Sequence, residues 1–171
     1  MVLDRSSGQT LVEAMVALGI ITAGLLALFA LIASSISAQR IVADRITATY
    51  LAAEGIEIVK NFIDTNALRA AFGCSWNNGA GCIELQEGAY EVDYASDSLF
   101  PDQNRFLARD TSTGLYGYSF AGAAEATPFV RRVTLVFSPD GDEMRVNSFV
   151  YWKSRGGEYN INVEDHFYNY R

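Results

Sequence analysis

The sequence is poor in positive charge. Lys and Arg together number 13 against 20 Asp and Glu, and the formal net charge is −7. Only two residues are lysines, and the arginines are scattered apart from Arg131-Arg132. Clustered basic residues supply most of the non-specific affinity for nucleic acids, because they neutralise phosphates and release counterions. The composition therefore argues against direct nucleic-acid binding by the isolated chain.

Residues that commonly carry catalysis are also scarce. The single histidine, His166, lies among acidic and aromatic residues near the C-terminus, and we interpret it as a surface or tail residue. Asp140 and Asp142 flank Gly141 and leave calcium binding open, but an EF-hand loop needs more ligands and a distal glutamate. We interpret this segment as a hairpin turn. The sequence therefore predicts no enzyme activity, no cofactor and no metal site.

Cysteine is limited to Cys74 and Cys82, close together in a Gly/Asn-rich loop. A metal site would need further Cys or His ligands, and His166 is far away in the sequence. A disulfide, two free thiols and a metal site are the three alternatives, of which we favour the disulfide. Closing so short a loop would stabilise the fold by roughly 2–3 kcal/mol in the chain-entropy model. It would also fit an oxidising compartment outside the cytoplasm.

No charged residue occurs between Glu13 and Arg40. Within this interval, residues 14–33 form an apolar run that would make a helix about 30 Å long, the thickness of the hydrocarbon core of a bilayer. A membrane anchor is one interpretation. A cleaved secretory signal is another, with small residues at Ser35 and Ser37 near a cleavage point, although the hydrophobic region of such a signal is normally about 7–15 residues. We favour a membrane-spanning helix.

The residues before the apolar run form a more specific pattern. Residues 7–13 read SGQTLVE and lie directly against the apolar stretch. This segment resembles the class III leader of type IV pilins and pseudopilins. The resemblance implies cleavage after Gly8 by a prepilin peptidase and N-methylation of the new N-terminal residue, Gln9. It also implies an assembly role for Glu13, whose carboxylate would pair with the amino group of Gln9 on a neighbouring subunit in the filament core.

A carboxylate at the edge of the hydrocarbon has a physical cost, and this gives Glu13 a role independent of the resemblance. The cost is about 2.5–3.5 kcal/mol at a helix centre on insertion scales and less near the interface, so such a residue is usually functional or paired. A glutamate that sits among lipid headgroups is the alternative. Pairing with an amino group would offset the burial of both charges in a low-dielectric filament core.

The resemblance also implies partners and a location. The partners are other pilin or pseudopilin subunits, the prepilin peptidase, an inner-membrane assembly platform and the lipid bilayer. The location is the cytoplasmic membrane, crossed once with the N-terminus inside, followed by an extracytoplasmic filament. Charge alone hardly sets this orientation, because Arg5 is balanced by Asp4 while Arg40 and Arg45 follow the apolar run. Gln9 stands where phenylalanine is common and the apolar half lacks a proline, which is closer to minor pilins and pseudopilins.

The apolar run continues into an amphipathic segment. No proline occurs between residues 9 and 66, so we expect one helix of about 50–58 residues. Apolar residues recur at intervals of three or four, as one helical face requires. The predicted face consists of Val42, Ile46, Tyr50, Ala53, Ile56, Val59 and Ile63.

The remainder of the chain predicts an antiparallel sheet. Residues 90–94 alternate as a half-buried strand, and residues 106–109 and 115–120 flank a turn-rich connector typical of a hairpin. Residues 129–137, 144–152 and 159–163 are separated by short turns and therefore predict a three-stranded meander. We expect an α+β fold of the type IV pilin kind, with the long helix packed on the sheet.

The expected organisation is a leader at 1–8, a transmembrane or filament-core helix at 9–36 and an extracytoplasmic domain at 37–171. That domain includes the amphipathic half of the helix at 37–65 and the sheet at about 89–165. The expected function is that of a structural subunit of a type IV pilus-like filament. A membrane-anchored binding module or enzyme domain is the alternative from a different class.

Overall fold

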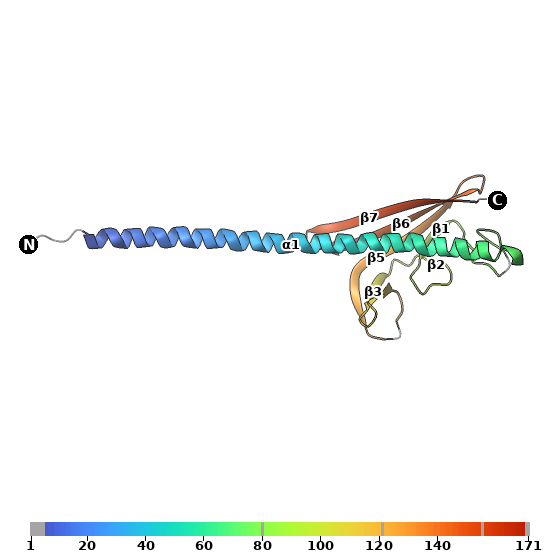
Figure 1. Cartoon of the computed structure of the whole chain (residues 1–171), viewed down its shortest axis with the longest axis horizontal. Coiled ribbons are helices and arrows are strands. Elements are labelled where there is room, and N and C mark those ends of the chain that lie inside the picture. The colour runs from blue at the N-terminus through green and yellow to red at the C-terminus, as the bar shows by residue number, and fades with distance from the viewer. Residues whose placement is uncertain (1–5, 80, 121, 155, 170–171) are drawn as a thin grey trace, which may run out of the picture. The chain divides into compact units, whose positions relative to one another are not determined.

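The structure is a computed structural model that describes residues 6–79, 81–120, 122–154 and 156–169, with side chains from Gln9 onward. It contains one long helix, a short 3-10 helix and a seven-stranded antiparallel sheet. This α+β arrangement, a long N-terminal helix with a C-terminal antiparallel sheet packed against it, confirms the predicted fold class (Figure 1). The chain divides into two compact units, of which the first ends at Val42 and the second begins at Ala43.

Helix α1 runs without interruption from Ser6 to Leu68. Its continuity follows from the absence of proline, which would remove a backbone hydrogen bond and clash with the preceding turn. A short 3-10 helix, η1 (Ala70–Phe72), follows and ends at Gly73, whose φ of 92° is the left-handed conformation that glycine adopts most readily. The prediction of a single continuous helix is therefore confirmed, and α1 is long and apolar enough to cross a membrane.

Seven strands make the sheet, and all of their pairings are antiparallel. The strands are β1 (Gly88–Glu91), β2 (Phe100–Pro101), β3 (Phe106–Asp110), β4 (Tyr116–Gly117), β5 (Ala124–Phe137), β6 (Glu143–Ser154) and β7 (Gly157–Tyr168). Strands β5, β6 and β7 form the predicted meander, and each extends beyond the predicted limits. Strands β3 and β4 form the predicted hairpin.

Strand β5 is the centre of the sheet. One edge pairs along its length with β6, while the other pairs with β3 through residues 124–130 and with β1 through residues 133–135. Strand β2 extends the β1 side, and β7 extends the β6 side. The sheet thus has two short outer strands, β2 and β4, along one side and a single long one, β7, along the other.

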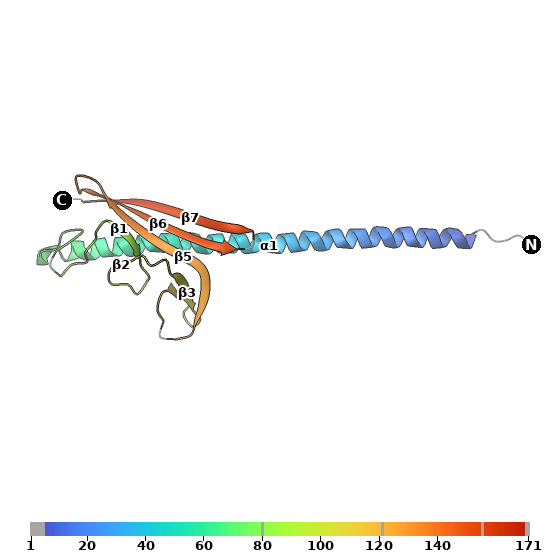
Figure 2. The same ribbon diagram turned by 180° about the vertical axis from the view of Figure 1, so that it is seen from behind.

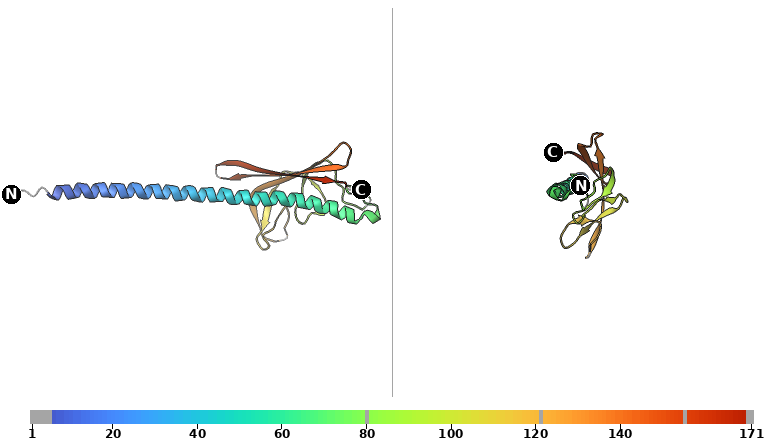
Figure 3. Two further views of the ribbon diagram at one scale, coloured as in Figure 1. Left: turned by 45° about the horizontal axis from the view of Figure 1, so that its top comes forward. Right: turned by 90° about the vertical axis from the view of Figure 1, so that its right-hand side faces the viewer.

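In the second unit, α1 covers one face of the sheet. Figures 1 and 2 show this from opposite sides, with α1 in front of the strands in the first view and behind them in the second. The end-on view in Figure 3 shows the helix in cross-section against one face of the sheet. Most of the core residues come from α1, β5 and β6, including Val59, Val133, Leu135, Val146 and Trp152.

The predicted apolar face of α1 is wrong in its first half. Val42, Ile46 and Tyr50 are 57%, 52% and 73% exposed. The face that packs on the sheet is formed by Ala48, Leu51, Ala52, Gly55, Ile56, Val59 and Phe62. The reason is geometric, since three of these residues have little or no side chain and let the helix backbone approach the sheet closely. Small residues contribute little to the hydrophobic periodicity of a helix. The sequence pattern therefore predicted the face of α1 that carries the larger apolar side chains.

Candidate functional site

The first feature of functional interest is the N-terminal segment of α1. From Gln9 to Arg40 every side chain is exposed, and no part of the apolar stretch is buried within the described chain. Leu26, Phe29 and Leu31 are examples, at 70%, 66% and 67% exposed. Contiguous apolar surface on this scale is not stable in water and marks a membrane-facing or protein-facing surface.

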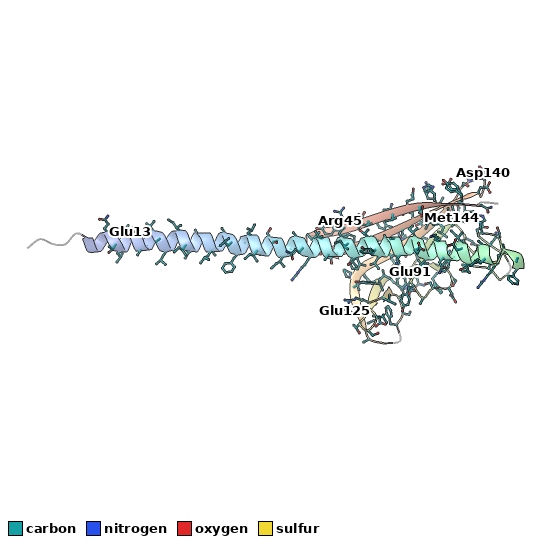
Figure 4. All side chains as sticks on the ribbon, in the orientation of Figure 1. Glu13, Arg45, Glu91, Glu125, Asp140 and Met144 are labelled. Carbon is teal, nitrogen blue, oxygen red and sulfur yellow. A yellow bond between two sulfur atoms is a disulfide. The ribbon has the colours of Figure 1, made fainter. Side chains whose placement is uncertain are left out.

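Glu13 lies at the N-terminal end of this apolar segment. Figure 4 shows its side chain projecting from the helix, and no ion pair to it occurs in the described part of the chain. Its neighbours Val12 and Met15 are 59% and 65% exposed. The structure therefore places a carboxylate with no ion pair among the described residues at the N-terminal end of the exposed apolar segment.

The proposed processing residues Gly8 and Gln9 lie within the backbone of α1. Gln9 is exposed, and the side-chain environment is described only from this residue onward. Residues 1–5 of the predicted leader lie outside the described residues. The structure thus brings Gly8, Gln9 and Glu13 together on one helical segment.

The two cysteines form the predicted disulfide. Cys74 and Cys82 are bonded with a Cα–Cα distance of 5.8 Å. Asn66, at the end of α1, anchors the same loop from within, with its side chain fully buried. Its amide donates to the carbonyl oxygens of Trp76 at 3.3 Å and Ile83 at 2.7 Å, and its oxygen accepts the Ile83 N–H at 2.9 Å. The loop is therefore fixed both covalently and by a buried amide, as a rigid structural element.

A buried arginine joins the helix to the sheet. Arg131 of β5 is 0% exposed, and its guanidinium donates from Nη1 to Glu54 Oε2 at 2.8 Å and to the Leu51 carbonyl oxygen at 2.9 Å. It also donates from Nη2 to the carbonyl oxygen of Val92. Neither Arg131 nor Glu54 was singled out from the sequence. Period-two alternation in β5 was the available signal, because it places Arg131 on the same face as Val133.

A second charged cluster holds the segment before β3. Glu91 is buried and accepts the backbone N–H groups of Gln103 at 3.0 Å and Arg105 at 2.9 Å, as well as Arg105 Nε at 2.6 Å. The Arg105 guanidinium lies over the Tyr118 ring, 4.7 Å from its centroid. Burial raises the pKa of Tyr118 to about 12, so this phenol stays protonated and donates to the Arg131 carbonyl oxygen at 3.2 Å.

His166 is a surface residue of β7, as predicted, with its side chain 42% exposed. Its Nδ1 contacts the Glu143 carboxylate, and its Nε2 lies 3.3 Å from Glu164 Oε1. Within the described residues, no three His, Cys, Asp or Glu side chains are arranged to hold a metal ion. The segment with Asp140 and Asp142 is the turn between β5 and β6, as predicted. His166, Glu143 and Glu164 thus contact one another on the surface of the sheet.

Comparisons with known proteins give no match: no family model, no curated protein and no solved structure is similar to this chain.

Proposed function

We propose that this chain is a structural subunit, of the minor pilin or pseudopilin kind, of a type IV pilus-like filament. The observation that carries the proposal is the uncovered apolar segment of α1 with one carboxylate, Glu13, at its N-terminal end. Such a segment must be covered by lipid or by other apolar helices. In the same chain, α1 continues beyond this segment as the helix that packs on the sheet.

In this proposal the segment exchanges one apolar environment for another. Before assembly the bilayer covers the residues between Glu13 and Arg40, and after assembly sister helices cover them. Apolar burial is similar in both states, so the energy for extraction has to come from assembly machinery, including an inner-membrane platform. Processing by a prepilin peptidase after Gly8 exposes the amino group of Gln9, which is then methylated.

In this proposal the Glu13 carboxylate determines how one subunit is positioned against the next when α1 moves from the bilayer into the filament. A buried carboxylate without a partner is strongly unfavourable in a low-dielectric core. Pairing with the Gln9 amino group of an adjacent subunit would satisfy both charges and fix the axial position of one subunit against the next. The disulfide between Cys74 and Cys82 is consistent with a folded domain outside the cytoplasm.

The mature N-terminus is the first test. Intact-mass and N-terminal peptide mass spectrometry of protein from the native host should identify Gln9 as the first residue, with one added methyl group. A start near Ala38 would mean that the apolar run is a cleaved signal, and the proposal would be wrong. An unprocessed Met1 would also contradict it and would favour a membrane-anchored domain.

Substitution of Glu13 is the second test. Glu13→Ala should abolish incorporation into filaments while leaving membrane insertion and processing intact, measured by immunoblotting of sheared filaments against membranes. Glu57→Ala is the matched control, because Glu57 is a carboxylate on the same helix whose side chain is 73% exposed and pairs weakly with Lys60 at 3.7 Å. Normal incorporation of the Glu13→Ala chain would rule out the assembly role of Glu13.

A further inference from the structure

Strand β7 is a long outer strand with an open edge. It pairs with β6 through twelve consecutive residue pairs without a bulge, and no other described strand pairs with it. It contains no proline and no lysine. Natural proteins usually protect outer strands with bulges, prolines, charged side chains (lysine above all) or a covering segment, because the unpaired backbone groups can bind another strand. Of these, β7 has only its acidic residues Glu158, Glu164 and Asp165.

The hairpin geometry determines which backbone groups point outward. Ser154 and Gly157 flank a two-residue loop, and such flanking residues exchange hydrogen bonds with each other. The alternation of hydrogen-bonded and non-hydrogen-bonded pairs continues without a shift to the far end of the strand. There the Asn169 N–H donates to the Asp142 carbonyl oxygen at 2.8 Å. The backbone N–H and C=O groups of odd-numbered β7 residues therefore hydrogen-bond to β6. The same groups of even-numbered residues point toward the open edge.

Part of that edge is already occupied. The His166 N–H donates to Asp165 Oδ1 at 2.8 Å, so the side chain of Asp165 closes one outward position. The backbone N–H groups that remain without a hydrogen bond within the described chain belong to Glu158, Asn160, Asn162 and Glu164. These groups form a continuous open stretch at the middle of the strand.

The face of β7 toward the helix is half covered. Tyr159, Ile161 and Val163 are half-buried and pack against the core, and the Tyr159 ring stacks on Trp152 with centroids 5.8 Å apart. Their outer sides lack the neighbouring strand that covers the equivalent residues of β6. An added strand with apolar residues at alternate positions would complete this face.

The residues of this edge are complementary to themselves. When residues 158–166 are placed antiparallel to a second copy around Asn162, no two like charges lie opposite each other, and the apolar residues Ile161 and Val163 lie opposite one another. The pairs are Glu158 with His166, Tyr159 with Asp165, Asn160 with Glu164, Ile161 with Val163, and Asn162 with Asn162 of the second copy. We propose that the open edge of β7 binds β7 of a second copy of this chain, antiparallel and centred on Asn162.

Other arrangements of the two strands are less favourable. A shift of two residues in one direction places Glu158 opposite Glu164, and the same shift in the other direction places Ile161 opposite Asp165. A shift of one residue reverses the faces of the added strand. Parallel pairing in register would set the acidic residues of the two copies beside each other. Charge and polarity thus select the antiparallel arrangement centred on Asn162.

The pairing has a directional consequence. Strand β7 and the part of α1 that packs on the sheet run in the same direction (Figures 1 and 2). Two copies joined through antiparallel β7 strands therefore have these helix segments pointing in opposite directions. The pairing requires only two copies of the chain with access to each other's β7 edges, and it does not depend on the function proposed above.

Cysteine substitutions test the pairing in the full-length chain in detergent micelles. Asn162→Cys places two thiols opposite each other across the two strands, about 5.5 Å apart between Cα atoms, which is within disulfide range. Asn160→Cys is the matched control on the same strand and face. Residue 160 lies opposite 164 of the second copy, so the two copies of residue 160 are separated by about 13 Å along the strand.

Under mild oxidation, Asn162→Cys should give a disulfide-linked dimer on a non-reducing gel, and Asn160→Cys alone should not. A mixture of Asn160→Cys and Glu164→Cys chains should form a heterodimer. Equal cross-linking of Asn162→Cys and Asn160→Cys would indicate random collision or association through the apolar helix, and it would overturn the proposal. Cross-linking of Asn162→Cys only to Glu164→Cys would overturn the register.

Sedimentation gives an independent readout without added thiols. Asn162→Glu places two carboxylates opposite each other and should abolish the dimer, whereas Asn162→Gln should retain it. A dimer that survives Asn162→Glu unchanged would contradict the proposed edge. The filament function is tested by the mature N-terminus of protein from the native host and by Glu13, neither of which involves β7, so failure of this proposal is distinguishable from failure of the filament function.

Discussion

Arg131 of β5 and Glu54 of α1 form an ion pair between helix and sheet, with Nη1 and Oε2 2.8 Å apart. The arginine is completely buried, whereas 31% of the Glu54 side chain is exposed. This asymmetry means that the arginine depends on its protein partners and the glutamate can still be hydrated. Removal of Glu54 therefore leaves a buried cation without its carboxylate partner, whereas removal of Arg131 leaves a carboxylate that water can still reach.

Removing Glu54 should destabilise the domain by leaving a buried cation. We expect Glu54→Ala to lower the free energy of unfolding by about 2–4 kcal/mol, near the lower end for breaking a buried pair because Glu54 is partly exposed. Arg131→Met should cost less than Arg131→Ala, because an apolar side chain of similar length fills the space. Denaturation followed by tryptophan fluorescence would measure both. Equal stability of Glu54→Ala and the unchanged chain would contradict this account.

Gly55 marks a close approach of α1 to the sheet. A Cβ at this position would lie 2.5 Å from Ser148 Oγ, 3.1 Å from Val133 Cγ2 and 3.2 Å from Arg131 Cδ. Gly55→Ala should therefore destabilise the domain by about 1–3 kcal/mol through overpacking, despite the roughly 1 kcal/mol gain in helix propensity. Gly24→Ala is the control, since nothing lies within 4 Å of its added Cβ.

Ser148 offers a rescue experiment for the same contact. Its hydroxyl is buried and has no hydrogen-bond partner in the described part of the chain. Ser148→Ala should be neutral or slightly stabilising, by up to about 1 kcal/mol, because it removes an unpaired buried polar group. Combined with Gly55→Ala, it should recover part of the lost stability. Strictly additive effects in a double-mutant cycle would show that the two residues do not interact.

The disulfide should stabilise the domain measurably. Replacing Cys74 and Cys82 together by alanine should lower the free energy of unfolding by about 2–3 kcal/mol, because the unfolded chain regains the freedom of the closed loop. Thermal unfolding with and without reductant would test this. The unchanged chain should lose stability in reductant, and the double variant should not respond.

The pair of His166 and Glu143 predicts a pH dependence of stability. The hydrogen bond from His166 lowers the pKa of Glu143 below its ordinary value of 4.5, and the same contact raises the pKa of His166 above 6.5. The histidine contribution is complete below pH 6.5 and is lost as pH rises through its raised pKa. The glutamate contribution is complete above pH 4.5 and is lost as pH falls through its lowered pKa.

The contact should thus stabilise the hairpin most between pH 4.5 and 6.5. Glu164 and Arg145 share the same exposed face, so the effect will be small and weakened by salt. The Tm of the unchanged chain minus that of His166→Gln, measured across pH in low salt, should be greatest in this window. A difference that is constant from pH 4 to 8 would contradict the assignment.

The parts of the fold that could be predicted from sequence are those with strong local signals. The absence of proline predicted the continuous helix, and the turns around Gly141 and Gly157 predicted the antiparallel order of β5, β6 and β7. Strand β1 begins before the predicted residue 90, at Gly88, and ends at Glu91 instead of residue 94, because Asp93 forms a turn with its own neighbours. Its carboxylate accepts the Ala95 N–H at 3.1 Å and the Ser96 hydroxyl at 2.9 Å, which competes with continued strand pairing.

The contacts that could not be predicted are those between segments distant in sequence. From the sequence alone, Arg131 would be interpreted as a surface charge. Its partners, Glu54 and the Val92 carbonyl oxygen, come from two other segments and become neighbours only in the folded chain. The packed face of α1 could not be predicted for the same reason. Gly55 allows the sheet to approach the helix closely, but the strands of that sheet come much later in the sequence. Gly8, Gln9 and Glu13 needed no tertiary information, since they are neighbours along one helix.

The contact between α1 and β5 also constrains how the protein is made. Translation proceeds from the N-terminus, so α1 leaves the ribosome well before the residues of β5 and β6 that cover its packed face. Leu51 and Val59 stay uncovered until Arg131, Val133 and Trp152 have been synthesised. During this interval the helix carries two uncovered apolar surfaces, and the described part of the chain later covers only the one that packs on the sheet. Rapid folding of the domain would therefore cover Leu51 and Val59 but would leave the apolar segment before Arg40 exposed.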